Sequence, residues 1–186
     1  MYLDGGFTSE KYMALRADAD AGEPDAMYEL GILWLNVGYQ QKADDYSQNG
    51  LAMLKGAVRQ GCAEAATYLG TVYHEGKCGL TIDMCEAVSW YKIGAEMGDP
   101  LAMSNYGIAL QRGDGNAPCD DEEAMRWICK AADAGLGVAQ YNAALAYHAG
   151  KGVRIDRVKA KHYFTMAADN GMEMARLWLY SEDYKN

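Results

Sequence analysis

Small and hydrophobic residues recur along this chain with the spacing of an amphipathic helix. The clearest stripe, at i, i+4, i+7 and i+8, consists of Ala65, Leu69, Val72 and Tyr73. A second stripe, which we also expect to be buried, consists of Ala87, Trp90, Tyr91 and Gly94. Its counterpart further along the chain consists of Ala124, Trp127, Ile128 and Ala131. These stripes predict a pair of helices joined by a turn.

The helix pair is repeated. Five glycines, each followed four positions later by alanine, mark equivalent points in the pattern, and we call them the anchor glycines: Gly22, Gly61, Gly98, Gly135 and Gly171. They are separated by 39, 37, 37 and 36 residues. The offset of a residue is its distance along the chain, in residues, after an anchor glycine. Helix pairs repeated at this period stack into a solenoid in which each repeat contacts only its neighbours.

The ends of the expected helices are also marked. Asp83, Asp120 and Asp156 stand where the second helices begin, and the first two have a glutamate three residues later, as in a capping box. The anchor glycines suit the left-handed position that ends a helix. Pro24 and Pro100 follow an anchor glycine by two residues, in the first turn of the next helix, where proline is tolerated.

Two further features concern the packing and the turns. Gly70 and Gly107 lie inside first helices, which indicates a close approach to the partner helix. The first unit lacks the short glycine turn and has instead the polar segment NVGYQQKADDYSQNG at residues 36–50. We expect an irregular and functional loop there.

Several segments resemble Sel1-like repeats, which are relatives of tetratricopeptide repeats. The matching segments are AATYLGTVY at 65–73, DDEEAMRW at 120–127, AADAG at 131–135 and GKGVRID at 150–156. The resemblance implies an all-α, right-handed α-solenoid (an α/α superhelix) of antiparallel helix pairs. It also implies a scaffold for protein interactions without catalytic residues.

On this basis we expect one domain over residues 1–186. It would have an N-terminal half unit at 8–22, four repeats at 23–61, 62–98, 99–135 and 136–171, and a C-terminal cap at 172–186.

Charge narrows the choice of partners. The net charge is −9, with −11 in residues 1–135 and +2 in residues 136–186. This overall acidity argues against nucleic-acid binding. The basic residues that cluster in this C-terminal part are Lys151, Arg154, Arg157, Lys159 and Lys161. They could receive an acidic partner, although we favour a solvated helix face.

Hydropathy and cysteine content bear on the compartment. No apolar run is long enough to span a membrane, and the first residues do not resemble a secretory signal. The five cysteines are an odd number without metal-binding spacing, which favours free thiols and a reducing compartment. We therefore expect a cytoplasmic protein, of bacterial origin.

Candidate catalytic and metal sites are weak. His74 and His148 share offset 13 but stand two repeats apart, about 20 Å at the usual spacing of packed helices, so one metal ion cannot bridge them. No phosphate-binding loop, dinucleotide fingerprint or HExxH motif is present. We expect neither an enzyme nor a cofactor.

A solenoid of this kind offers a concave groove lined by its first helices. Related repeats use positions near offsets 6, 7, 10, 13 and 14. Carried over to this chain, the expected partner-binding residues are Tyr28, Glu29, Thr67, Tyr68, Thr71, His74, Ser104, Asn105, Ile108, Gln111, Arg112, Tyr141, Asn142 and His148. For Tyr68, Ile108 and Tyr141, packing within the array is an equally good interpretation.

The expected function is a scaffold or adaptor that binds another protein or peptide in this groove, with no nucleic-acid or membrane partner and a monomer as the default state. An immunity or inhibitor protein that clamps one toxin or enzyme is the alternative. An enzyme using thiols or histidines is a third hypothesis. The sequence leaves open the partner's identity and any part played by the basic residues or by residues 36–50.

Overall fold

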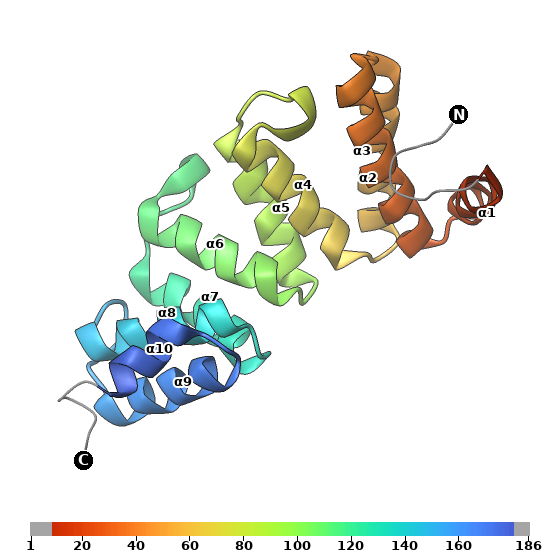
Figure 1. Ribbon diagram of the computed structural model, residues 1–186. Helices are drawn as coiled ribbons and strands as arrows, with labels where there is room; N and C mark the ends of the chain where they lie inside the picture. The colour runs from red at the N-terminus through yellow and green to blue at the C-terminus, as the bar shows by residue number, and fades with distance from the viewer. Residues whose placement is uncertain (1–8, 181–186) are drawn as a thin grey trace. The chain divides into compact units, whose positions relative to one another are not determined.

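The computed structural model describes residues 9–180, and within this range every regular element is a helix (Figure 1). In chain order the elements are α1 (Ser9–Asp20), α2 (Pro24–Gln41), α3 (Asp44–Arg59), α4 (Ala63–Glu75), η1 (Lys77–Gly79), α5 (Met84–Glu96), α6 (Pro100–Arg112), η2 (Asp114–Asn116), α7 (Asp121–Asp133), α8 (Gly137–Ala149), α9 (Arg157–Asp169) and α10 (Glu173–Leu179). The prediction of an all-α chain of helix pairs is confirmed. No helix of the described range is long and apolar enough to cross a membrane.

The chain divides into two compact units, Met1–Trp90 and Tyr91–Asn186, which we call unit 1 and unit 2. In unit 1, α2 packs on α3, with Leu30, Leu35 and Leu54 fully buried. In unit 2, α6 pairs with α7 and α8 with α9, around a core that contains Ile128 and Phe164. Much of the remaining core is alanine, which lets the helices lie close together.

Capping and glycine packing follow the sequence signals. The Asp120 carboxylate accepts a hydrogen bond from the Glu123 N–H at 2.9 Å, and Asp156 accepts one from the Lys159 N–H at the same distance. A Cβ at Gly107 would lie 2.8 Å from Ile128 Cγ1, so glycine is what allows α6 to approach α7. The anchor glycines all have positive φ, as expected.

The tryptophans of the second helices are less buried than expected. Trp90 and Trp127 are only half-buried, whereas their alanine neighbours are fully enclosed. Trp127 packs in an edge-to-face contact with Tyr106, with ring centroids 5.8 Å apart, and the Lys130 ammonium lies over the Trp127 ring, 4.1 Å from its centroid. Each indole therefore covers the edge of the core rather than filling its centre.

The prediction of an irregular loop at residues 36–50 is wrong. Helix α2 continues to Gln41 and α3 begins at Asp44, which leaves only Lys42 and Ala43 between them. The first helices of the next three repeats end at a left-handed glycine at offset 15 (Gly76, Gly113 and Gly150). Repeat 1 has Val37 at that offset, so nothing ends the helix there.

The turn that precedes α9 packs repeat 4 closely against repeat 3. Gly152 has φ +68°, and a Cβ there would overlap the carbonyl oxygen of Asp121 and lie 2.9 Å from Met125 Cγ. Lys151 Nζ lies 3.8 Å from Asp121 Oδ1, which adds an ion pair to the same contact. Only a glycine lets this turn sit directly on the first turns of α7.

Candidate protein-binding surface

The exposed face of the first helices is regular from repeat to repeat. It is formed by offsets 3, 7, 10 and 14, which share one side of a helix. We call this face the first-helix stripe. It comprises Asp25, Glu29, Ile32, Asn36, Glu64, Tyr68, Thr71, Glu75, Leu101, Asn105, Ile108, Arg112, Val138, Asn142, Leu145, Ala149, Met174 and Trp178. None of these side chains is buried.

In unit 1 two expected residues meet. The rings of Tyr28, from α2, and Tyr68, from α4, are in edge-to-face contact, with their centroids 6.1 Å apart. Burial, followed by the effect of the nearby Cys78, raises the pKa of Tyr68 to about 12, so the phenol stays neutral. Cys78 Sγ in turn lies 3.8 Å from Asn36 Oδ1. These contacts support both interpretations of Tyr68: it packs against α2, and it still reaches the surface.

Offset 6 is mostly a packing position. Thr67 and Ser104 are only 4% and 2% exposed, so they are not available to a partner, contrary to expectation. The Thr67 hydroxyl donates to the carbonyl oxygen of Ala63 at 3.3 Å. Tyr28 and Tyr141 keep partial exposure at this offset because their rings are longer. The accessible face is thus rotated away from offset 6 and towards offset 3.

The remaining expected residues of unit 1 lie at the surface. Glu29 and His74 are exposed, and Thr71 is half-buried with its hydroxyl donating to the Thr67 carbonyl at 3.0 Å. With Asp25 and Glu64 at offset 3, the stripe of unit 1 is acidic. We expect this face to repel acidic ligands.

In unit 2 the expected residues of α8 are partly covered by α10. Trp178 Nε1 donates to the Tyr141 hydroxyl at 3.3 Å, and the indole contacts the His148 ring at 4.9 Å. The indole also stacks on Phe164 at 5.2 Å. Trp178 is therefore a functional candidate that sequence analysis missed. Its signal was present, since it stands at offset 7, where Asn105 and Asn142 stand in the two preceding repeats.

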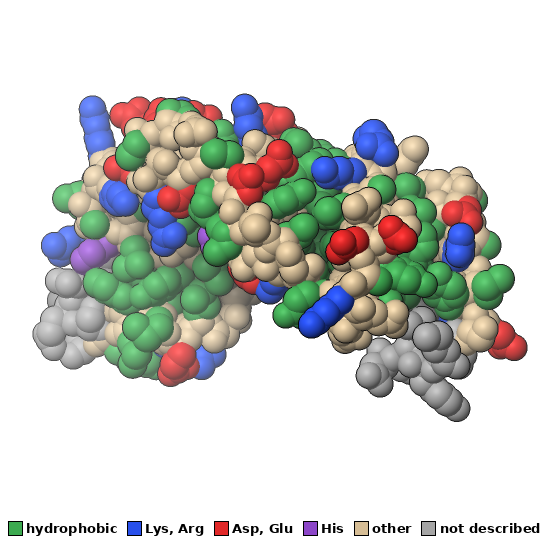
Figure 2. Space-filling view, turned by 90° about the horizontal axis from the view of Figure 1, so that it is seen from above, with side chains coloured by type: hydrophobic (Ala, Val, Ile, Leu, Met, Phe, Trp, Pro, Cys, Tyr) green, Lys and Arg blue, Asp and Glu red, His purple; other side chains and the backbone are tan. Residues whose placement is uncertain are grey.

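The rest of the expected set in unit 2 is accessible. Asn105, Ile108, Gln111 and Asn142 are half-buried, and Arg112 is exposed. Unlike unit 1, the unit 2 part of the stripe contains no aspartate or glutamate. On the face drawn in Figure 2, hydrophobic side chains reach the surface between scattered charged ones. Recognition by the unit 2 part of the stripe would depend on apolar and amide groups, because these are its accessible side chains besides Arg112.

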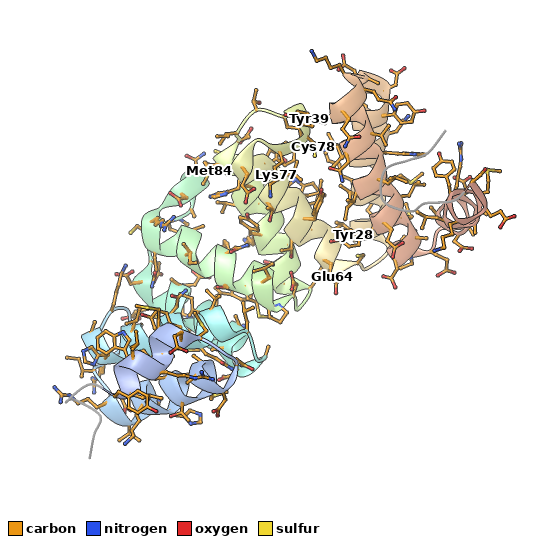
Figure 3. The ribbon with its side chains drawn as sticks, viewed as in Figure 1. Tyr28, Tyr39, Glu64, Lys77, Cys78 and Met84 are labelled. Atoms are coloured by element: carbon orange, nitrogen blue, oxygen red, sulfur yellow. The ribbon has the colours of Figure 1, made fainter. Side chains whose placement is uncertain are left out.

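The extended hairpin of repeat 1 forms one wall of a cleft of about 670 Å³. Tyr39 from α2 is 61% exposed and lies beside η1, where Cys78 and Gly79 form the facing edge (Figure 3). Cys78 has a φ of 56°, in the left-handed region that glycine favours, while its counterpart in repeat 3, Gly115, has the same φ. Residues 36–50 therefore form the end of α2 and the start of α3 instead of a loop, and they contribute a helical edge to the cleft.

A second cleft, of about 450 Å³, lies on the second-helix side of unit 2. Here Tyr147 stacks on Tyr163 at 5.8 Å, and the Tyr163 hydroxyl donates to Asp133 Oδ1 at 2.9 Å. Cys129 Sγ lies 3.9 Å from the Tyr147 hydroxyl. Burial raises the pKa of Tyr147 to about 12 and also raises the pKa of Cys129, so both groups stay protonated near neutral pH.

Several of the thiols and histidines are held in packing contacts. Burial raises the pKa of Cys62 and Cys78, which disfavours the nucleophilic thiolate. His148 packs against Trp178 and His162 against Tyr163. Among residues 9–180, no group of three or more His, Cys, Asp or Glu side chains could hold a metal ion.

Several curated proteins resemble this chain. Chitin synthase regulatory factor 3 of Schizosaccharomyces pombe is 29% identical over 157 residues, which is 81% of this chain and 16% of that protein. Chitin synthase regulator SKT5 of Saccharomyces cerevisiae is 30% identical over 173 residues, 90% of this chain and 24% of that protein. This chain thus spans about a quarter or less of the length of these relatives.

Solved structures resemble it over most of its length. A Sel1 repeat protein from Oxalobacter formigenes has a TM-score of 0.77 and 28% identity, covering 91% of this chain and 68% of that one. The c5321 protein, a protective antigen present in uropathogenic Escherichia coli strains, has a TM-score of 0.75 and 31% identity, covering 91% and 36%. The family described as Sel1 repeat matches residues 24–61, 63–99, 100–136 and 137–172. The chain therefore belongs to the Sel1 repeat family.

Proposed function

We propose that this protein is a non-catalytic scaffold or adaptor that binds another protein through its first-helix stripe. The observation that carries the proposal is the accessibility of this stripe, where eighteen positions in one register include no buried side chain. Within each unit, a surface that repeats with the fold offers equivalent contact points to a partner. The fungal relatives named as chitin synthase regulators also fit a protein-binding role.

The composition of the stripe supports recognition of a protein. Half-buried residues such as Tyr68 and Trp178 are held by neighbouring rings, so they lose little conformational freedom on binding. Rigid aromatic side chains of this kind often provide much of the binding energy at interfaces. The polar residues around them, such as Asn105 and Asn142, would add directional hydrogen bonds.

We also propose a reducing compartment, consistent with a cytoplasmic location. All five cysteines lie within the described residues, and none of them forms a disulfide there. Cys62, Cys78 and Cys129 are buried or half-buried by packing within the chain.

The test is affinity capture with the full chain as bait. A variant with Asn105→Arg and Asn142→Arg places two cations on the stripe of unit 2. The matched control, His162→Arg with Thr165→Arg, adds the same charges on the exposed side of α9. We expect the wild type and the control to capture the same partner and the stripe variant to lose it. Capture of the same partner by all three baits would refute binding through the unit 2 part of the stripe.

A further inference from the structure

One face of α7 contributes most of the lining residues of the cleft of about 450 Å³ in unit 2. Its charged side chains stand four residues apart, which places them in one row along the helix: Glu122, Arg126 and Lys130. All three are exposed, whereas Met125 is buried and Tyr147 half-buried. The cleft therefore has less polar groups inside and charged groups at its edge.

The two cations of this row are not required by the fold. Arg126 and Lys130 stand nine and five residues before an anchor glycine. The same positions in the other paired second helices hold no lysine or arginine: Ala52 and Gly56 in α3, Ser89 and Ile93 in α5, and His162 and Met166 in α9. A role in packing or capping that all repeats share does not explain these cations.

A third cation reaches the cleft from α9. The Lys159 ammonium lies 5.1 Å from the centroid of the Tyr147 ring, which is part of the lining. An aromatic ring attracts an ammonium group but does not neutralise its charge. None of the side chains of Arg126, Lys130 and Lys159 forms an ion pair with another residue among those at 9–180. All three charges are thus available to a ligand.

The carboxylates at the cleft are fewer and partly engaged. Asp133 accepts a hydrogen bond from the Tyr163 hydroxyl at 2.9 Å. Glu122 is the other lining carboxylate, and it has no such partner among the described residues. The three cations outnumber these two groups, so the cleft has a locally positive charge in a protein of net charge −9.

The inner lining does not oppose an anionic ligand. Burial raises the pKa of Tyr147 to about 12 and also raises the pKa of Cys129, so neither group is negatively charged at neutral pH. The volume lies within the range of about 300–1,000 Å³ of sites that hold small ligands. One large side chain of a peptide is smaller than such a ligand, so the cleft can receive it.

The arrangement of charges favours a peptide over an anionic membrane. Carboxylate side chains on either side of an inserted residue can turn towards Arg126 and Lys130. A flat membrane would approach Glu122 and Asp133 together with the cations, and it would leave the cleft unfilled. Its extended charge would also be repelled by the acidic protein as a whole, whereas salt screens this repulsion beyond about 8–10 Å for a short peptide.

We propose that this cleft binds an acidic segment of a partner protein. A large apolar side chain of the segment enters the cleft, and its aspartate or glutamate side chains pair with Arg126, Lys130 and Lys159. No residue of the first-helix stripe takes part, so this inference does not depend on the proposed function. It assigns a second docking surface to unit 2.

The test uses the full chain and three rhodamine-labelled peptides, with binding followed by fluorescence anisotropy at low ionic strength. The peptides are Glu-Glu-Phe-Glu-Glu, Gln-Gln-Phe-Gln-Gln, which lacks the charges, and Glu-Glu-Ser-Glu-Glu, which lacks the apolar side chain. We expect the first peptide to bind at least about fivefold more tightly than either of the others. Added salt should weaken its binding.

Three variants locate the site. Arg126→Gln with Lys130→Gln should weaken binding of the first peptide at least about fivefold. Glu122→Gln should strengthen it about twofold, a gain that unfolding could not produce. The matched control, Arg59→Gln with Lys92→Gln, removes two exposed cations elsewhere and should leave the affinity unchanged. Circular dichroism checks that each variant is folded.

Equal affinity for the acidic and neutral peptides, or absence of binding, would overturn the inference. So would an equal loss in the double variant and its control, or binding that Glu122→Gln does not strengthen. Cosedimentation with vesicles that contain phosphatidylserine adds a further arm. Vesicle binding that only the double variant at Arg126 and Lys130 loses would make this a lipid-binding surface and overturn the inference. The capture experiment with the stripe variant tests the proposed function separately.

Discussion

Replacing Gly152 by alanine should weaken the contact between repeats 3 and 4. The backbone at Gly152 has φ +68°, which costs an L-residue about 1–2 kcal/mol. The new Cβ would also overlap the Asp121 carbonyl and lie 2.9 Å from Met125 Cγ. Overpacking of this kind costs about 1–3 kcal/mol, since the backbone must shift. We therefore expect a total loss of about 2–5 kcal/mol.

Gly135→Ala is the matched control. Gly135 has φ +95°, and a methyl group added there would meet no atom within 4 Å, so this variant should lose only the backbone contribution of about 1–2 kcal/mol. Urea unfolding followed by circular dichroism gives both values. Hydrogen exchange should show the additional loss of protection in α7 and in the turn before α9. Equal destabilisation by the two substitutions would refute the proposed seating of the Gly152 turn on α7.

Four further results are expected. Phe164→Ala should lower the free energy of unfolding by about 3–5 kcal/mol, because this side chain is fully buried against Trp178; a loss below about 1 kcal/mol in urea unfolding would contradict its core role. Asp120→Ala should cost about 1 kcal/mol through loss of the cap of α7, and an unchanged urea midpoint would exclude that role. Because the pKa of Tyr68 is about 12 in the folded state and lower in the unfolded state, the free energy of unfolding should fall as the pH rises from 10 towards 12. Urea unfolding at pH 9 and pH 11 should show a smaller decline of this free energy for Tyr68→Phe than for the wild type. Equal declines would contradict a raised pKa for Tyr68. Alkylation at pH 8, followed by mass spectrometry, should modify the exposed Cys85 before Cys62, which is 5% exposed with a raised pKa; the reverse order would show that Cys62 is accessible.

Local signals in the sequence were sufficient for the helices and their ends. The caps at Asp120 and Asp156 and the close contact at Gly107 were predicted because each depends on a few neighbouring residues in one repeat. The extension of α2 was missed because polar composition was interpreted as a loop. Its actual determinant was the absence of a helix-ending glycine, with Val37 in its place.

The accessible surface was predicted only in part. Burial of Thr67 and Ser104 depends on how a first helix meets its neighbours, and the periodicity of one helix does not encode that angle. The half-burial of Trp127 also depends on how neighbouring helices meet, because its ring lies at the edge of the contact between α6 and α7. Trp178 was overlooked because the last helix was treated as a cap and not as a further first helix.

The extended hairpin of repeat 1 also affects how this segment can change in evolution. A loop absorbs insertions and deletions of any length, but each residue added to or removed from a helix rotates the rest of that helix by about 100°. Loss of one residue from the last turns of α2 would turn Tyr39 away from η1 and break the close fit between Gly38 and Ser47. Length changes in this hairpin should therefore survive only in near-whole helical turns, matched between α2 and α3. Homologues that differ here are expected to differ by such steps.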